Sequence, residues 1–162
     1  MKRLILFITG VLLIVLENSV INYIDIFGVT FSILLPVLVI SSLYMDEVEA
    51  GVIGLLLGLI VDISVGGIFG FNALVYAIIS AVIAHYKKNF YVDSTSMVMA
   101  LIAISTAFQS LLMMIMSLIA YQTDGILIMI LKGFIILPLL NILAGFVIYK
   151  LFGRVIMKLR KE

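Results

Sequence analysis

The chain has no cysteine, no tryptophan, two prolines and one histidine in 162 residues. Without cysteine, a disulfide framework, a thiol nucleophile and a thiolate metal site are all excluded. A single histidine, His85, cannot form a histidine cluster. Charge is also scarce. Charged residues make up 12% of the chain and the net charge is +1, which gives no support to nucleic-acid binding, because that requires basic residues clustered on a folded face.

Apolar residues, in contrast, are abundant. They make up 65% of the chain, and the mean hydropathy is +1.37, whereas a soluble domain is only about half apolar and about a quarter charged. A soluble core of this length could not hide so much apolar surface, so lipid must cover part of it. We therefore predict an all-α integral membrane protein that forms a single transmembrane domain over residues 1–162.

Six apolar segments are predicted to be transmembrane helices, since a span needs roughly 17–25 apolar residues. The predicted spans are approximately residues 4–23, 29–44, 48–61, 68–84, 97–121 and 126–149. The third is short for ~30 Å of hydrocarbon, so we expect local bilayer thinning or a turn that dips into the membrane. Residues 150–162 are predicted to form a basic amphipathic helix at the cytoplasmic surface or, alternatively, an extension of the sixth span.

The basic residues predict the orientation, because cytoplasmic flanks retain Lys and Arg. With six spans, nearly all of these residues fall on one side, namely Lys2, Arg3, Lys87, Lys88, Lys150, Arg154, Lys158, Arg160 and Lys161. We therefore predict a multi-pass protein of the bacterial inner membrane with both termini in the cytoplasm. The basic start and the apolar run after it imitate a secretory signal, but no A-x-A-like site follows, so we expect an uncleaved first span.

Small residues form stripes on two neighbouring spans. Gly51, Gly54 and Gly58 lie on one face of the third span, and alanines lie at similar spacing on the fourth. Small residues let helix backbones approach closely in lipid. Packing of the two stripes within the monomer is one interpretation, and docking of a partner helix is the other.

The segment from Gly51 to Tyr76 is the most specific element of the chain. Asp62 ends an apolar run without a charged neighbour, and an isolated carboxylate there is costly, so it should lie at a membrane boundary or on a partner. The glycines that follow allow a compact reversal. Asn72 could cap the fourth helix or bond to Asp62 across the turn. The candidate partner-binding or structural residues are Gly54, Gly58, Asp62, Gly67, Gly70 and Asn72.

Lys132 is the one basic residue predicted to lie away from the cytoplasmic flanks. It could snorkel outward or pair with Glu17 or Asp62, and a structural ion pair suits it better than a transport site. No nucleophile and base come together in the predicted topology, and no acidic residues cross the bilayer centre. We therefore expect neither an enzyme nor a proton relay, and no cofactor or metal.

One part of the sequence resembles a known family. Gly58-Leu59-Ile60-Val61-Asp62, followed by Gly70-Phe71-Asn72-Ala73-Leu74-Val75-Tyr76, resembles the MreD family of rod shape-determining membrane proteins, which shows Gly-Leu-x-x-Asp, a glycine-containing turn and Gly-x-x-Ala-Leu. Length, six spans and basic ends also match. The family often has a Pro-Asp pair at the start of its second span, where this chain has Thr30-Phe31-Ser32 and its proline at Pro36.

The resemblance implies a non-enzymatic scaffold of the cell-elongation machinery, which builds the lateral peptidoglycan wall and so controls rod shape. It implies an MreC-like partner and, through it, MreB, RodA and a class B penicillin-binding protein, and it leaves a homo-oligomer open. The family is also similar in architecture to the S-components of energy-coupling-factor transporters, so a vitamin-capturing transporter subunit is the alternative. That alternative requires an outward pocket with converging polar and aromatic groups. A pore or holin-like protein would need a continuous polar face, which this chain lacks.

Overall fold

The computed structural model describes residues 2–24, 26, 28–65, 68–90, 94–121 and 126–159, with only the backbone at 2–4, 22, 120–121, 126 and 151–159. Apart from connecting segments, these residues are helical. The helices are α1 (Lys2–Ser19), α2 (Leu34–Ser42), α3 (Glu47–Val65), α4 (Phe71–Tyr86), α5 (Thr95–Tyr121), α6 (Ile126–Leu131) and α7 (Leu137–Leu159), with 3-10 turns η1 (Ile21–Tyr23) and η2 (Lys87–Asn89) and a π-helical segment η3 (Lys132–Ile136).

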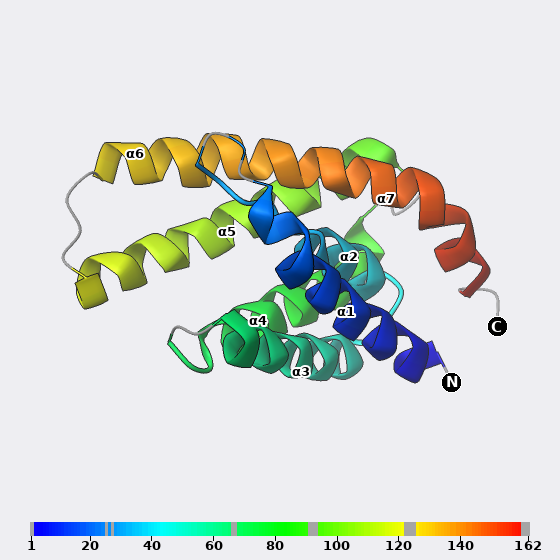
Figure 1. Ribbon diagram of the computed structural model, residues 1–162. Helices are drawn as coiled ribbons and strands as arrows, with labels where there is room; N and C mark the ends of the chain where they lie inside the picture. Colours follow the sequence, from blue (N-terminus) through cyan, green and yellow to red (C-terminus); the bar gives the residue numbers. More distant parts are fainter. Residues whose placement is uncertain are drawn as a thin grey trace.

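The helices α6, η3 and α7 follow one another without a break and form one long rod (Figure 1). The described part of the chain is thus an all-α bundle of six helices. The start of α1 and the end of α7 lie at the same end of the bundle in Figure 1. Both ends of a chain lie at the same end of a bundle when an even number of helices runs back and forth. This agrees with the six predicted helices.

Fewer helices than predicted have the length of a membrane span. In the described ranges, Glu47–Val65, Thr95–Ile119 and Leu127–Lys150 are long and apolar enough to cross a membrane, and the apolar helix Ile5–Ser19 is shorter. The predicted second span, 29–44, contains a helix of only 9 residues, α2, which extends about 14 Å at 1.5 Å per residue. The helix α2 by itself is thus shorter than ~30 Å of hydrocarbon, and the crossing of the membrane by residues 29–44 stays a prediction.

The helix α2 is instead the centre of the bundle. It contacts α1, α3, α4, α5 and α7, and Leu35, Val39 and Ile40 are fully buried. A helix that is apolar all round belongs in an interior, and here the interior is protein rather than lipid. Hydropathy cannot distinguish these two environments, and this explains why the predicted segment, 29–44, is longer than the helix α2.

The third helix is longer than predicted. It runs for 19 residues to Val65, about 28 Å at the α-helical rise, so it needs neither a thinned bilayer nor a turn within the membrane. Asp62 lies in its last turn rather than at its end. The carboxylate was expected to stop the helix, but it is buried there and bonded to α4, as described below.

The helices α3 and α4 pack closely through the predicted small-residue stripes. A Cβ at Gly54 would lie 2.5 Å from the Tyr76 carbonyl oxygen, and one at Gly58 would lie 2.5 Å from the Asn72 carbonyl oxygen and would also meet the Ala73 backbone. Both glycines are buried. Of the two interpretations of the stripe, the structure shows packing within the chain.

We expect Gly58→Ala to destabilise the fold by about 1–3 kcal/mol, because a Cβ in a filled space forces backbones apart. Gly51→Ala is the matched control on the same helix face, since a Cβ there would meet the Ala81 Cβ at an ordinary 3.5 Å. The measurement is the thermal unfolding midpoint of each purified protein in one detergent. Equal midpoints for the two variants would contradict the close packing of α3 on α4.

Candidate functional site

The carboxylate of Asp62 holds the start of α4. Asp62 is only 6% exposed. Its Oδ2 accepts the backbone N–H groups of Gly70 at 3.0 Å and Ala73 at 3.1 Å, and its Oδ1 accepts the backbone N–H and the side-chain amide of Asn72 at 3.1 and 2.9 Å. A helix start carries unbonded N–H groups and a partial positive charge. The acidic group therefore finds its partners within the chain, at the first turn of the next helix.

The turn before α4 depends on a glycine. Gly70 occupies the position before the first helical residue with φ +88°, and because glycine has no side chain, the cap of α4 comes from Asp62. This φ is one that residues with a Cβ rarely adopt. Of the two roles expected for Asn72, the structure shows the bond to Asp62 across the turn. Gly67, the other candidate glycine of this turn, lies outside the described residues.

Glu17 of α1 makes a similar contact at the start of α2. Its Oε2 accepts the backbone N–H groups of Ile33 and Leu34, both at 3.0 Å, and the Ser32 hydroxyl at 3.2 Å. The Ser32 hydroxyl in turn accepts the Leu35 N–H at 3.2 Å. A carboxylate on one helix thus caps the next helix at two places in the described chain.

Asn141 connects the start of α2 to two other helices. It is fully buried in α7, accepts the Ser32 N–H at 2.9 Å and donates to the Thr106 hydroxyl of α5 at 3.1 Å. Thr106 donates to the Ile102 carbonyl of its own helix at 2.8 Å. Sequence reasoning did not predict this role, although a single amide in the middle of an apolar helix is the signal that points to a polar partner.

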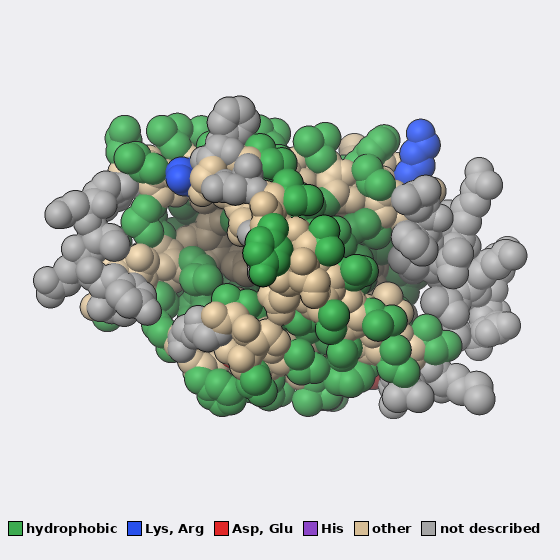
Figure 2. Space-filling model, viewed as in Figure 1, with side chains coloured by type: hydrophobic (Ala, Val, Ile, Leu, Met, Phe, Trp, Pro, Cys, Tyr) green, Lys and Arg blue, Asp and Glu red, His purple; other side chains and the backbone are tan. Residues whose placement is uncertain are grey.

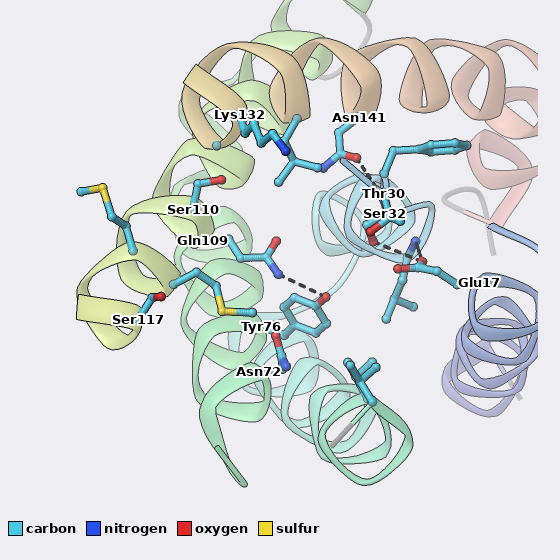
Figure 3. Close-up of a pocket in the computed structure, with 18 of the residues that line it drawn as sticks. Glu17, Thr30, Ser32, Asn72, Tyr76, Gln109, Ser110, Ser117, Lys132 and Asn141 are labelled. Carbon is cyan, nitrogen blue, oxygen red and sulfur yellow. Dashed lines mark hydrogen bonds between the residues drawn. The ribbon is translucent and has the colours of Figure 1, made fainter. Parts of the chain in front are cut away.

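These groups surround a cavity of about 510 Å³ that is lined by residues of α1 to α5 and of the α6–η3–α7 rod (Figure 3). Several polar side chains line it, and the close-up shows them converging from different helices. They include Glu17, Asn72, Tyr76, Gln109, Ser110, Ser117 and Lys132. Met113, Met114 and Met129 add an apolar side. The cavity combines a mainly apolar wall with a few polar groups, as ligand sites commonly do.

The π-helical segment η3 determines which side chains reach the cavity. In an uninterrupted α-helix, at about 100° per residue, Lys132 and Asn141 would lie about 180° apart. The hydrogen bonds of η3 span one residue more, which takes up roughly one residue of rotation and leaves the two side chains about 80° apart. Both line the cavity. Local π-helical turns occur often at functional sites.

Glu17 and Lys132 lie in the wall of the same cavity but form no ion pair with each other among the described contacts. The Lys132 ammonium donates to the Gly28 carbonyl at 3.1 Å, while the carboxylate of Glu17 caps α2. The structure thus brings the two predicted partners to one site and gives each a backbone partner. In the described ranges, no three His, Cys, Asp or Glu side chains gather in a way that could hold a metal.

Comparison with protein families decides the identity. Residues 1–159 match the family described as rod shape-determining protein MreD. The chain belongs to the MreD family. This confirms the resemblance seen between Gly58 and Tyr76. The MreD family consists of non-enzymatic, multi-pass membrane proteins with a role in determining rod cell shape.

Comparisons with curated proteins and with solved structures gave no match. The similarity in architecture to transporter S-components therefore stays a prediction. The residues that carried the MreD resemblance do have physical roles in this fold. Gly58 permits the close approach of α3 and α4, Gly70 makes the turn, and Asp62 with Asn72 closes it.

We expect Asp62→Asn to lower stability by about 1–3 kcal/mol, because an amide replaces one acceptor oxygen with a donor and leaves a buried N–H of α4 unpaired. The measurement is the thermal unfolding midpoint in detergent. Ser64→Ala is the control, since the Ser64 hydroxyl is exposed and bonds only to the Ile60 carbonyl of its own helix among the described contacts. If both variants unfolded at the wild-type temperature, the cap would not stabilise the fold.

Proposed function

We propose that this MreD-family protein is a non-enzymatic scaffold of the bacterial cell-elongation complex in the inner membrane. It binds an MreC-like protein and, through it, is linked to MreB, RodA and a class B penicillin-binding protein. The observation that carries the proposal is the family match over residues 1–159, which covers every described helix. A role in rod shape requires contact with the machinery that builds the lateral wall, and a protein of a non-enzymatic family acts through such contacts.

The partner surface that we propose is the corner where α3 turns into α4. The glycine face of α3 is covered by α4, so the contact uses side chains that point away from the bundle. Ile63 and Phe69 are 71% and 70% exposed, and they flank the Asp62 cap. Because Asp62 fixes the start of α4 with four hydrogen bonds, this part of the surface is already positioned before a partner binds, which lowers the entropy cost of association.

We expect Phe69→Ala to reduce co-purification of the MreC-like protein by at least about tenfold, as truncating a central aromatic side chain does in many interfaces. Leu139→Ala is the matched control, because Leu139 is also an exposed apolar residue but lies on α7. The measurement is the amount of partner recovered per tagged chain in mild detergent. Equal recovery with both variants would show that the partner binds elsewhere.

For the orientation, we propose that both termini and the loop after α4 lie in the cytoplasm. Lys87, at the end of α4, donates to the Met45 carbonyl at 2.6 Å and to Asp46 at 3.2 Å. His85 lies 2.8 Å from the Glu47 carboxylate. The acidic loop between α2 and α3 is thus joined to the basic end of α4, and this positively charged end suits the cytoplasmic side.

Because the chain has no cysteine, single-cysteine variants test this orientation directly. We expect Lys88→Cys to be protected from a membrane-impermeant maleimide in intact spheroplasts and to react after lysis. Ser64→Cys, at the opposite end of the bundle, should react before lysis. Both positions are exposed, so access depends on the side of the membrane. The reverse pattern would invert the orientation and place the proposed partner corner inside the cell.

One observation favours the alternative of a small-molecule transporter subunit, namely the cavity of about 510 Å³. Its volume lies in the range of ligand pockets, and Tyr76 supplies an aromatic wall. Calorimetric titration of the purified protein with water-soluble vitamins tests this candidate. Binding in the micromolar range or tighter would support it over the scaffold.

A further inference from the structure

The cavity beside η3 has no part in the scaffold function proposed above. We propose that it binds one membrane lipid with a phosphate-bearing head group, whose acyl chains leave through the side of the bundle. Four features of the cavity support such a ligand, namely the position of its opening, an unpartnered hydroxyl, a lysine in its wall and its size.

The cavity opens on the flank of the bundle. Figure 2 views the long helices from the side, and the surface is hollowed there near the blue side chain on the α6–α7 rod. Val65 and Met113 both line the cavity and are exposed, so they lie at its mouth. Hydrophobic side chains lie beside the hollow, together with backbone and other side chains (Figure 2). A lateral opening beside hydrophobic side chains admits a ligand from the bilayer.

Ser110 is a polar group without a partner in this wall. It is 7% exposed, and its hydroxyl oxygen is buried with no hydrogen-bond partner in the described structure. Figure 3 shows the hydroxyl on the cavity side of α5. Opposite it is Gly133 of η3, where a Cβ would crowd the Ser110 Cβ at 3.2 Å. A buried hydroxyl without a partner calls for an explanation, and a ligand acceptor is one.

Lys132 adds a positive charge to the same wall. Its ammonium holds the Gly28 carbonyl at 3.1 Å, and η3 turns the side chain toward the cavity (Figure 3). A cation at membrane depth is costly unless an anion or a dipole accompanies it. Phosphate oxygens satisfy a lysine as a point charge and also accept from hydroxyl groups. Lys132 and Ser110 together therefore match a phosphate group.

The size and the apolar side of the cavity favour a lipid over a helix of another protein. A transmembrane helix is about 10–12 Å wide and rises about 5.4 Å per turn, so a cavity of about 510 Å³ would hold little more than one turn. A head group with the first part of its chains fits this space. Met113, Met114 and Met129 line it, and methionine adapts to irregular apolar shapes such as acyl chains.

The test is native mass spectrometry of the full chain in mild detergent, with added phosphatidylglycerol, a diacylglycerol of the same chains, or inorganic phosphate alone. We expect one phosphatidylglycerol to stay bound per chain, and Lys132→Gln to lower its retention roughly tenfold, the effect of one charge-assisted hydrogen bond. Ser110→Ala should lower it less. Lys150→Gln is the matched control, since Lys150 is exposed on α7 and lies outside the cavity.

Three results would overturn the proposal. The first is equal retention of diacylglycerol and phosphatidylglycerol, which would remove the phosphate from the recognition. The second is displacement of the lipid by inorganic phosphate, which would make free phosphate the ligand. The third is equal retention by Lys132→Gln and Lys150→Gln. None of these measurements involves the MreC-like partner, so their failure would leave the scaffold function standing.

A second measurement does not depend on removing Lys132. Because the chain has no tryptophan, Met113→Trp introduces a single fluorophore at the mouth of the cavity. One equivalent of phosphatidylglycerol with brominated chains should quench it saturably in detergent, whereas Leu143→Trp, at an exposed site outside the cavity lining, should be quenched far less. Equal quenching at both sites would mean that lipid only coats the surface. If binding of the MreC-like partner abolished the quenching at Met113→Trp, the occupant of the cavity would be a helix of that partner and not a lipid.

Discussion

The fold depends on carboxylates that cap the start of the next helix. Asp62 of α3 holds the first turn of α4, and Glu17 of α1 holds the first turn of α2. Where water is excluded, each unsatisfied backbone N–H costs several kcal/mol, so a helix that starts inside the bundle needs an acceptor from elsewhere. The carboxylates in turn need donors, because a bare anion in an apolar environment is unstable. Each group thus offsets the cost of burying the other, and the two contacts join α1 to α2 and α3 to α4.

The helix α2 depends most on these capping contacts. At 9 residues it is too short to span a bilayer, and it lies in the middle of the bundle with apolar residues on all sides. Its start is held by Glu17 from one direction and, through Ser32, by Asn141 from another. The longer helices around it provide the lipid-facing surface. The interior polar contacts at one end of α2 also form part of the cavity wall, so the stability of the bundle and the shape of the cavity have the same origin.

Much of this could be predicted from the sequence. The excess of apolar residues predicted an all-α membrane protein, and the segment from Gly58 to Tyr76 led to the MreD family. Both are local signals, since hydropathy sums over a window and close-packing glycines recur at helical spacing. The length of the second helix was overestimated because burial in protein and burial in lipid select the same side chains. The length of the third helix was underestimated because an isolated carboxylate in an apolar run suggests the end of a helix. The N–H donors that allow Asp62 to lie within the helix belong to residues after the next turn.

The sequence by itself determined the class of protein, the family and the small-residue stripes on α3 and α4, because those properties are encoded in neighbouring residues, whereas the packing of one stripe on the other was shown by the structure. Only the tertiary structure decided which groups meet. Asn141 bonds to Ser32 across 109 positions of the chain, and no periodicity links them. Likewise the π-helical turn η3, which rotates Lys132 into the cavity, has no signature in hydropathy. Hydrogen-bond partners and rotations of this kind are determined by the packing of the whole bundle, which brings together residues that are far apart in the chain.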